Sequence, residues 1–76
     1  MASLPAVSGP EAIDAFEKVG FVLDRIKGSH HILKREGWPY ALSVPVHGSK
    51  PVASGTLRSL IRAAGLTVEE FVSLLD

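Results

Sequence analysis

The sequence predicts an α+β fold in which helices cover one face of a three-stranded antiparallel sheet. Segments with helical spacing of apolar residues and with capping residues stand towards both ends of the chain. Between them lie three short runs with the apolar and β-branched character of strands, separated by turn residues. The expected order is therefore α-β-β-β-α with a short C-terminal helix, in two layers.

The first helix is expected from about residue 10 to residue 19. Ser8 and Glu11 have the S-x-x-E spacing of a capping box. Pro10 stands in a first helical turn, where its missing N–H would have no partner. Apolar residues then follow at helical spacing. Gly20 can adopt the left-handed conformation that closes a helix.

Three strands are expected at residues 21–27, 30–35 and 40–46, joined as an antiparallel meander. Gly28 and Ser29 form a tight turn between the first two. The third run alternates, which is typical of a strand with one buried face. Its inward side carries three apolar residues, Leu42, Val44 and Val46.

Proline lacks a ladder donor, so Pro45 indicates that the end of the third strand lies at an edge of the sheet. A second helix then starts at Ser54 or Gly55 and ends at Gly65. Its core stripe is spaced i, i+3, i+4, i+7. The stripe consists of Leu57, Leu60, Ile61 and Ala64.

Thr67 and Glu70 form a second capping box, which begins the short last helix. One sheet face is left to solvent or to a ligand. Double-stranded-RNA-binding domains have the same order of elements, which favours RNA as a ligand by analogy of fold alone.

The composition narrows the class of protein. Seventy-six residues are enough for one domain, which we expect to span residues 1–76. Without cysteine there is no disulfide or thiolate chemistry, and three histidines without a ligand spacing predict no metal and no cofactor. No apolar run reaches about 18 residues and no signal peptide is recognisable, so we expect a cytoplasmic protein without a membrane span.

The charges are segregated along the chain although the formal net charge is zero. Residues 25–62 carry seven basic side chains and one acidic one, whereas the rest of the chain carries one basic and seven acidic side chains. A basic centre favours an anionic ligand, and nucleic acid is the commonest.

Four blocks of sequence resemble one family. They read R-I-K-G-S-H-H-I (25–32), V-P-V-H-G (44–48), G-T-L-R-S-L-I-R-A-A-G-L (55–66) and E-E-F (69–71). In this order and spacing the chain resembles the HicA-type, YcfA-like toxins of bacterial toxin–antitoxin systems. The resemblance covers roughly residues 10–75.

The resemblance implies a double-stranded-RNA-binding-like fold and metal-independent cleavage of mRNA. It also implies neutralisation by a HicB-type antitoxin. Any contact with operator DNA is expected only through the antitoxin complex. The family's catalytic histidine follows Gly-Ser, which points to His30. The loop before the second helix often carries further lysines in the family. Here it reads Pro51-Val52-Ala53-Ser54, so a phosphate contact from this loop depends on Lys50.

The chemistry of the residues agrees with a ribonuclease. An imidazole can exchange a proton near neutral pH, and RNA supplies its own nucleophile, the 2′-OH. We expect His30 to be the catalytic acid or base. The expected RNA-binding residues are Lys27, Ser29, Lys34, His47, Lys50, Arg58 and Arg62.

Several roles have a structural alternative. Strand alternation points His31 away from His30, towards the core. His47 is as compatible with capping a loop as with binding RNA or assisting catalysis. Arg58 and Arg62 can be solvated helix residues instead of phosphate ligands. Trp38 and Tyr40 can stack on bases, but packing across strands is favoured. The alternatives to an enzyme are a non-catalytic RNA-binding module and a protein-interaction domain.

Overall fold

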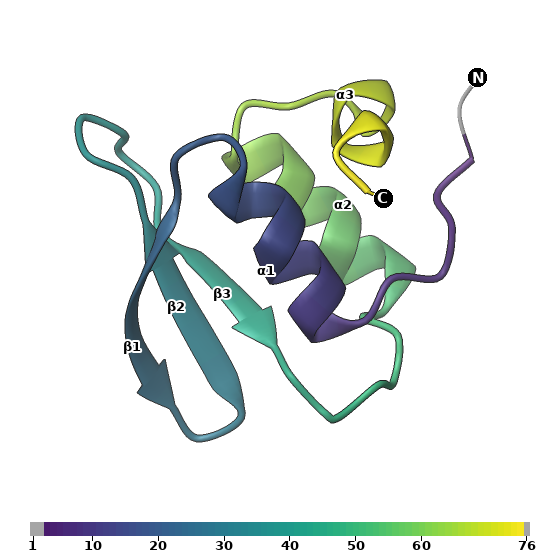
Figure 1. Ribbon diagram of the computed structural model, residues 1–76, viewed down its shortest axis with the longest axis horizontal. Helices are drawn as coiled ribbons and strands as arrows, with labels where there is room; N and C mark the ends of the chain where they lie inside the picture. Colours follow the sequence, from purple (N-terminus) through teal and green to yellow (C-terminus); the bar gives the residue numbers. More distant parts are fainter. Residues whose placement is uncertain (1–2, 76) are drawn as a thin grey trace.

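A computed structural model describes residues 3–75, and its elements follow the expected order (Figure 1). The chain order of the three helices and three strands is α-β-β-β-α-α. Their bounds are α1 (Gly9–Glu17), β1 (Val22–Lys27), β2 (His30–Lys34), β3 (Leu42–Pro45), α2 (Ser54–Ala63) and α3 (Val68–Ser73). None of the helices within this range has the length and apolar character needed to cross a membrane.

The three strands form one antiparallel meander in the order β1-β2-β3. β2 pairs with β3 from His30 opposite Pro45 to Leu33 opposite Leu42. β1 pairs with β2 less regularly, because the register shifts between Leu23 and Arg25 and leaves an extra residue in β1. β3 is an edge strand, as the position of Pro45 predicted.

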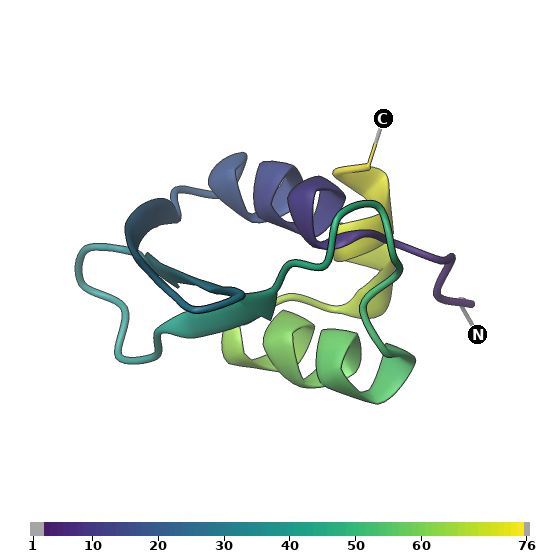
Figure 2. The same cartoon turned by 90° about the horizontal axis from the view of Figure 1, so that it is seen from below.

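The core lies between the helices and the β3 side of the sheet. Both α1 and α2 contact β3, and the β1–β2 hairpin extends away from the two helices (Figure 2). Phe16 of α1 is fully buried, with its ring centroid 5.2 Å from that of Phe71 and 6.1 Å from that of Phe21. Leu33 is also fully buried, but every residue of β1 is exposed.

Both predicted capping boxes are confirmed. The Ser8 hydroxyl accepts from the Glu11 N–H and the Glu11 carboxylate accepts from the Ser8 N–H, at 3.3 and 2.9 Å. Thr67 and Glu70 make the same pair of bonds at the start of α3. α2 starts at Ser54, although the residue before it makes no side-chain capping bond.

The ends of several elements differ from the prediction. α1 ends at Glu17, because residues 18–20 form a turn closed by Gly20 at φ 99°. Phe21 precedes β1 and is buried. β3 is shorter than expected and ends at Pro45. Val46 follows it, and its N–H bonds to the Ser29 carbonyl.

Trp38 packs, as predicted, but its main partner is α2 and not a neighbouring strand. Its indole N–H donates to the carbonyl of Ala63 at 2.8 Å. The Arg35 guanidinium lies 4.4 Å from the ring centroid, and the Tyr40 ring meets the indole edge to face at 6.3 Å. The β2–β3 connection is thereby held against the end of α2.

Candidate functional site

The turn end of the β1–β2 hairpin carries His30. This residue begins β2 directly after the Gly28–Ser29 turn, in which Gly28 has a φ of 61° that favours glycine. Its Cα partner across the hairpin is Lys27, and both side chains are exposed. Paired residues project from the same face of a sheet, so the imidazole and the ammonium group share one face.

The two adjacent histidines point in opposite directions. His30 alternates with His31, and His31 pairs with Val44, which is fully buried. His31 is half-buried, and its Nδ1 is buried without a hydrogen-bond partner among the described residues. The predicted core-facing position of His31 is confirmed, which leaves His30 on the open face.

The loop between β3 and α2 is tied to the same end of the sheet. The Val46 N–H donates to the Ser29 carbonyl at 2.7 Å, next to the hairpin turn. His47 follows directly, and its carbonyl accepts from the Lys50 N–H at 3.1 Å. The structure therefore attaches the start of this loop, which carries His47, to the hairpin end that carries His30. Lys50 lies further along the loop, next to Pro51, which bridges to Ser8 before α1.

Contacts with α1 and with the segment before it hold both ends of this loop. The Val52 N–H donates to the Val7 carbonyl at 2.7 Å, which attaches the far side of the loop to the segment before α1. A Cβ atom on Gly9 would lie 2.5 Å from the carbonyl oxygen of Pro45 and 2.9 Å from a methyl carbon of Val46. Only glycine allows this approach of α1 to the end of β3.

The cations around the site differ in how far they are neutralised. Asp24 accepts from Arg25 at 3.0 Å and lies 3.6 Å from the ammonium of Lys34. Among residues 3–75, no hydrogen bond or ion pair occupies the charged groups of Lys27 and Lys50. Lys27 therefore offers uncompensated positive charge directly opposite His30, and Lys50 carries uncompensated charge in the loop after β3.

The two arginines of α2 are not gathered at His30. Both are exposed. Arg62 lines a hollow with Tyr40, and Tyr40 precedes the start of β3. His30 is paired with the other end of β3. The predicted RNA-binding residues are therefore dispersed. Lys27 and Ser29 lie at the turn of the hairpin, Lys34 lies opposite Val22 at the other end of β2, and the two arginines lie along α2.

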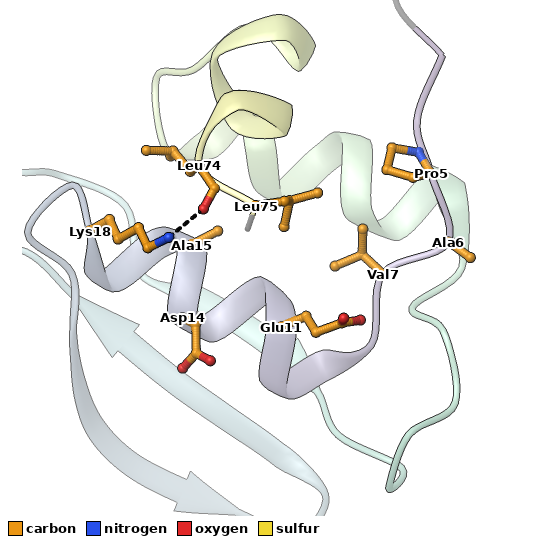
Figure 3. A pocket seen from close by; sticks show the side chains of 9 residues that line it. All are labelled: Pro5, Ala6, Val7, Glu11, Asp14, Ala15, Lys18, Leu74 and Leu75. Atoms are coloured by element: carbon orange, nitrogen blue, oxygen red, sulfur yellow. Dashed lines mark hydrogen bonds between the residues drawn. The ribbon is translucent and has the colours of Figure 1, made fainter.

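A cavity of about 350 Å³ lies away from this site, between residues 5–7, α1 and the residues after α3 (Figure 3). Glu11 and Asp14 line it, and Lys18 donates to the carbonyl of Leu74 at its rim. Two carboxylates disfavour a polyanion there. Within the described part of the chain, no three His, Asp or Glu side chains gather in an arrangement that could hold a metal ion.

A comparison with protein families connects this geometry to a known group. The family model described as the HicA toxin of bacterial toxin–antitoxin systems matches residues 9–66. The chain belongs to the HicA toxin family. Among curated protein sequences, none matches the chain significantly.

HicA membership makes the chain the toxin component of a toxin–antitoxin system and implies a cognate antitoxin. The matched HicA segment runs from α1 into the turn after α2, so it contains all of the predicted RNA-binding residues and leaves α3 outside.

Sequence reasoning gave no role to Asp24 and Arg25 on the surface of this HicA toxin, and it missed the partner of Tyr40. Asp24 neutralises Lys34, which follows from the register of the hairpin and from the bulge. Arg25 is paired with Ile32 and so lies on the face of His30, a position that its spacing of two from Lys27 could have indicated. Tyr40 lines a hollow formed with α2, and no local pattern reveals that partner.

Proposed function

We propose that this HicA toxin is a metal-independent endoribonuclease that cleaves mRNA with His30 as its acid–base group. The observation that carries the proposal is the exposed pair of His30 and Lys27 at the end of the hairpin. An imidazole on a rigid strand, beside an uncompensated ammonium group, suits proton transfer next to a phosphodiester.

The substrate supplies the nucleophile in this proposal. His30 takes the proton of the ribose 2′-OH, the 2′ oxygen attacks the adjacent phosphorus, and the bond to the 5′ oxygen of the next nucleotide breaks. The products are a 2′,3′-cyclic phosphate and a 5′-hydroxyl end. Lys27 stabilises the negative charge that develops on the phosphate oxygens.

The leaving 5′ oxygen needs a proton. His47 lies at the same end of the sheet and offers a second imidazole for this step. General acid–base help of this kind supplies about 10²–10⁴-fold in rate. The remaining predicted residues, Ser29, Lys34, Lys50, Arg58 and Arg62, serve to bind RNA in this proposal.

A HicB-type antitoxin is the proposed partner, and the open sheet face around His30 is its proposed target. Occlusion of this face would block substrate access without any change in the fold. Any binding of operator DNA is assigned to the complex and not to the toxin alone. Action on mRNA places the toxin in the cytoplasm.

The test is a substrate with a single 2′-deoxy position at the cleavage site. RNA cleavage is expected to continue in EDTA, to yield 2′,3′-cyclic phosphate ends, and to stop at the modified position. DNA of the same sequence should bind and survive. Cleavage of the modified position at an undiminished rate would show that water is the attacking group and would exclude this mechanism.

A non-catalytic RNA-binding module is the second candidate, and the segregated positive charge favours it independently of His30. Purified toxin that binds RNA but leaves it intact, with no effect of His30→Ala, would favour the binding module. The partner is tested by purifying the toxin with the product of the neighbouring gene. RNA cleavage that persists in a saturated complex would exclude occlusion.

A further inference from the structure

A hollow of about 360 Å³ lies between the β2–β3 connection and α2. Its lining consists of Tyr40, Ser59, Arg62 and Ala63. The volume falls within the range of small-molecule sites in proteins. The hollow does not belong to the hairpin end that carries His30, because Tyr40 stands before the start of β3 and His30 is paired with its end.

One wall of this hollow is rigid and aromatic. Tyr40 is 59% exposed, and its ring rests against the edge of Trp38. Trp38 is itself fixed by its bond to the Ala63 carbonyl and by the Arg35 guanidinium over its ring. An exposed aromatic ring on a fixed support can stack with little loss of conformational freedom on binding.

The polar groups of the hollow are free to bind a ligand. Within residues 3–75, neither the guanidinium of Arg62 nor the hydroxyls of Tyr40 and Ser59 have a hydrogen-bond partner. A guanidinium presents a planar fork of donors that fits phosphate oxygens, and an aromatic ring presents a face for any base. Together they match one nucleotide of a single-stranded nucleic acid.

We propose that the Tyr40–Arg62 hollow is a subsite for one nucleotide of single-stranded RNA, with the base stacked on Tyr40 and the phosphate bound by Arg62. This inference rests on the proposed ribonuclease function and adds a binding position outside the cleavage site. Ser59 donates to the base edge or to the ribose.

Cations along α2 extend the positive charge from the loop after β3 to the subsite. α2 begins just after the loop that carries Lys50, bears Arg58 and Arg62 one turn apart, and ends beside Tyr40. Tyr40 is five residues from Pro45, the partner of His30, which limits the backbone separation to about 18 Å. About five stacked nucleotides at ~3.4 Å each cover this distance.

Trp38 makes the subsite directly observable, because it is the only tryptophan of the chain and adjoins Tyr40. The experiment uses the His30→Ala protein, which leaves RNA uncut, and an end-labelled single-stranded RNA of twelve nucleotides. Anisotropy of the label measures total binding, while the emission of Trp38 measures occupancy of the hollow. Variants of Tyr40 and Arg62 are compared with Arg58→Gln, which removes the same charge one helical turn away.

RNA is expected to change the Trp38 emission, and Tyr40→Ala is expected to weaken binding at least about fivefold, the low end for loss of one base–aromatic stack. Tyr40→Phe keeps the ring and should bind as the parent does. Arg62→Gln should diminish the Trp38 response even when the anisotropy is saturated. Arg58→Gln removes a proposed phosphate contact outside the hollow, so it should weaken total binding but reach the full Trp38 response at saturation.

Two failures are distinguishable. If RNA raises the anisotropy, but the Trp38 emission is unchanged and Tyr40→Ala binds like the parent, the subsite is excluded and the ribonuclease proposal stands. If no RNA binds at any concentration of the folded protein, both proposals fail together. Circular dichroism and the melting temperature verify that each variant is folded.

Discussion

His30 and Lys27 are opposite each other in the last pair of the β1–β2 hairpin, next to the Gly28–Ser29 turn. Directly opposed residues of an antiparallel pair have Cβ atoms about 4.5–5.5 Å apart. The proposed proton-transfer group and an uncompensated charge thus start from neighbouring positions on the hairpin. A modest displacement of either strand end would separate them.

Replacement of His30 by alanine is expected to abolish growth arrest on expression and to reduce RNA cleavage about 10²–10⁴-fold. The side chain is exposed, so the melting temperature should stay that of the parent. Both readouts come from one preparation of each protein. A folded His30→Ala protein that is as toxic as the parent would contradict the catalytic assignment.

Lys27→Gln is expected to reduce the salt dependence of RNA binding by about 0.7 in the slope of log K against log salt, the value for one phosphate contact on a single strand. Lys34→Gln should have a smaller effect, because Asp24 already lies 3.6 Å from the Lys34 ammonium. Affinities measured over a series of salt concentrations give both slopes. Equal slopes for the two variants would show that the pairing with Asp24 does not reduce the phosphate contact of Lys34.

Alanine substitutions at the two ends of α2 should have opposite effects on the free energy of unfolding. Gly65 has a φ of 77°, and a Cβ there would lie 2.8 Å from the Trp38 ring, so Gly65→Ala should destabilise the fold by about 1–2 kcal/mol or more. Gly55 lies in α2 with open space around its Cβ position, so Gly55→Ala should stabilise by about 0.4–1 kcal/mol. Urea unfolding measures both, and a stabilising Gly65→Ala would refute the close approach of Trp38.

The capping box of α1 should appear in the acid stability. The hydrogen bond from the Ser8 backbone N–H, with a smaller contribution from the Ser8 side chain, lowers the pKa of Glu11 below its usual value. A lowered folded-state pKa stabilises the protein above the ordinary pKa of glutamate, and this contribution is lost as pH falls through the folded-state pKa. Glu11→Gln should therefore flatten the decline of melting temperature in mildly acidic solution.

Glu17→Gln is the matched control for this measurement, because it removes a carboxylate from the last residue of the same helix. No hydrogen bond to the Glu17 carboxylate is present within residues 3–75. The acid profile of Glu17→Gln should follow that of the parent. Identical profiles for Glu11→Gln and the parent would mean that the capping carboxylate contributes no measurable pH dependence.

The local features of the fold could be predicted because their causes are local. The capping boxes of Ser8 with Glu11 and of Thr67 with Glu70 need only a spacing of three residues. The opposite facing of His30 and His31 needs only the alternation of a strand. The likeness of four short blocks to the HicA family identified His30 as a candidate, and neither charge nor periodicity could have done so.

Features that depend on tertiary placement could not be predicted. Val22, Leu23 and Ile26 favour a strand, yet they are 62, 46 and 57% exposed, since both long helices contact β3 and the hairpin extends away from them. The Trp38 indole bonds to α2, 25 residues away. A hollow lined by segments that are distant in sequence, such as the one between Tyr40 and Arg62, cannot be predicted from the spacing of residues.

The cavity of Figure 3 shows where the two ends of the described chain meet. Pro5 and Val7 line one side of it and Leu74 and Leu75 the other, at a distance from the hairpin turn that carries His30. A fluorescent protein or an affinity handle fused at either end would therefore leave the hairpin unobstructed. Covalent tethering of an inhibitory domain at these ends would require a linker long enough to pass around the helical layer.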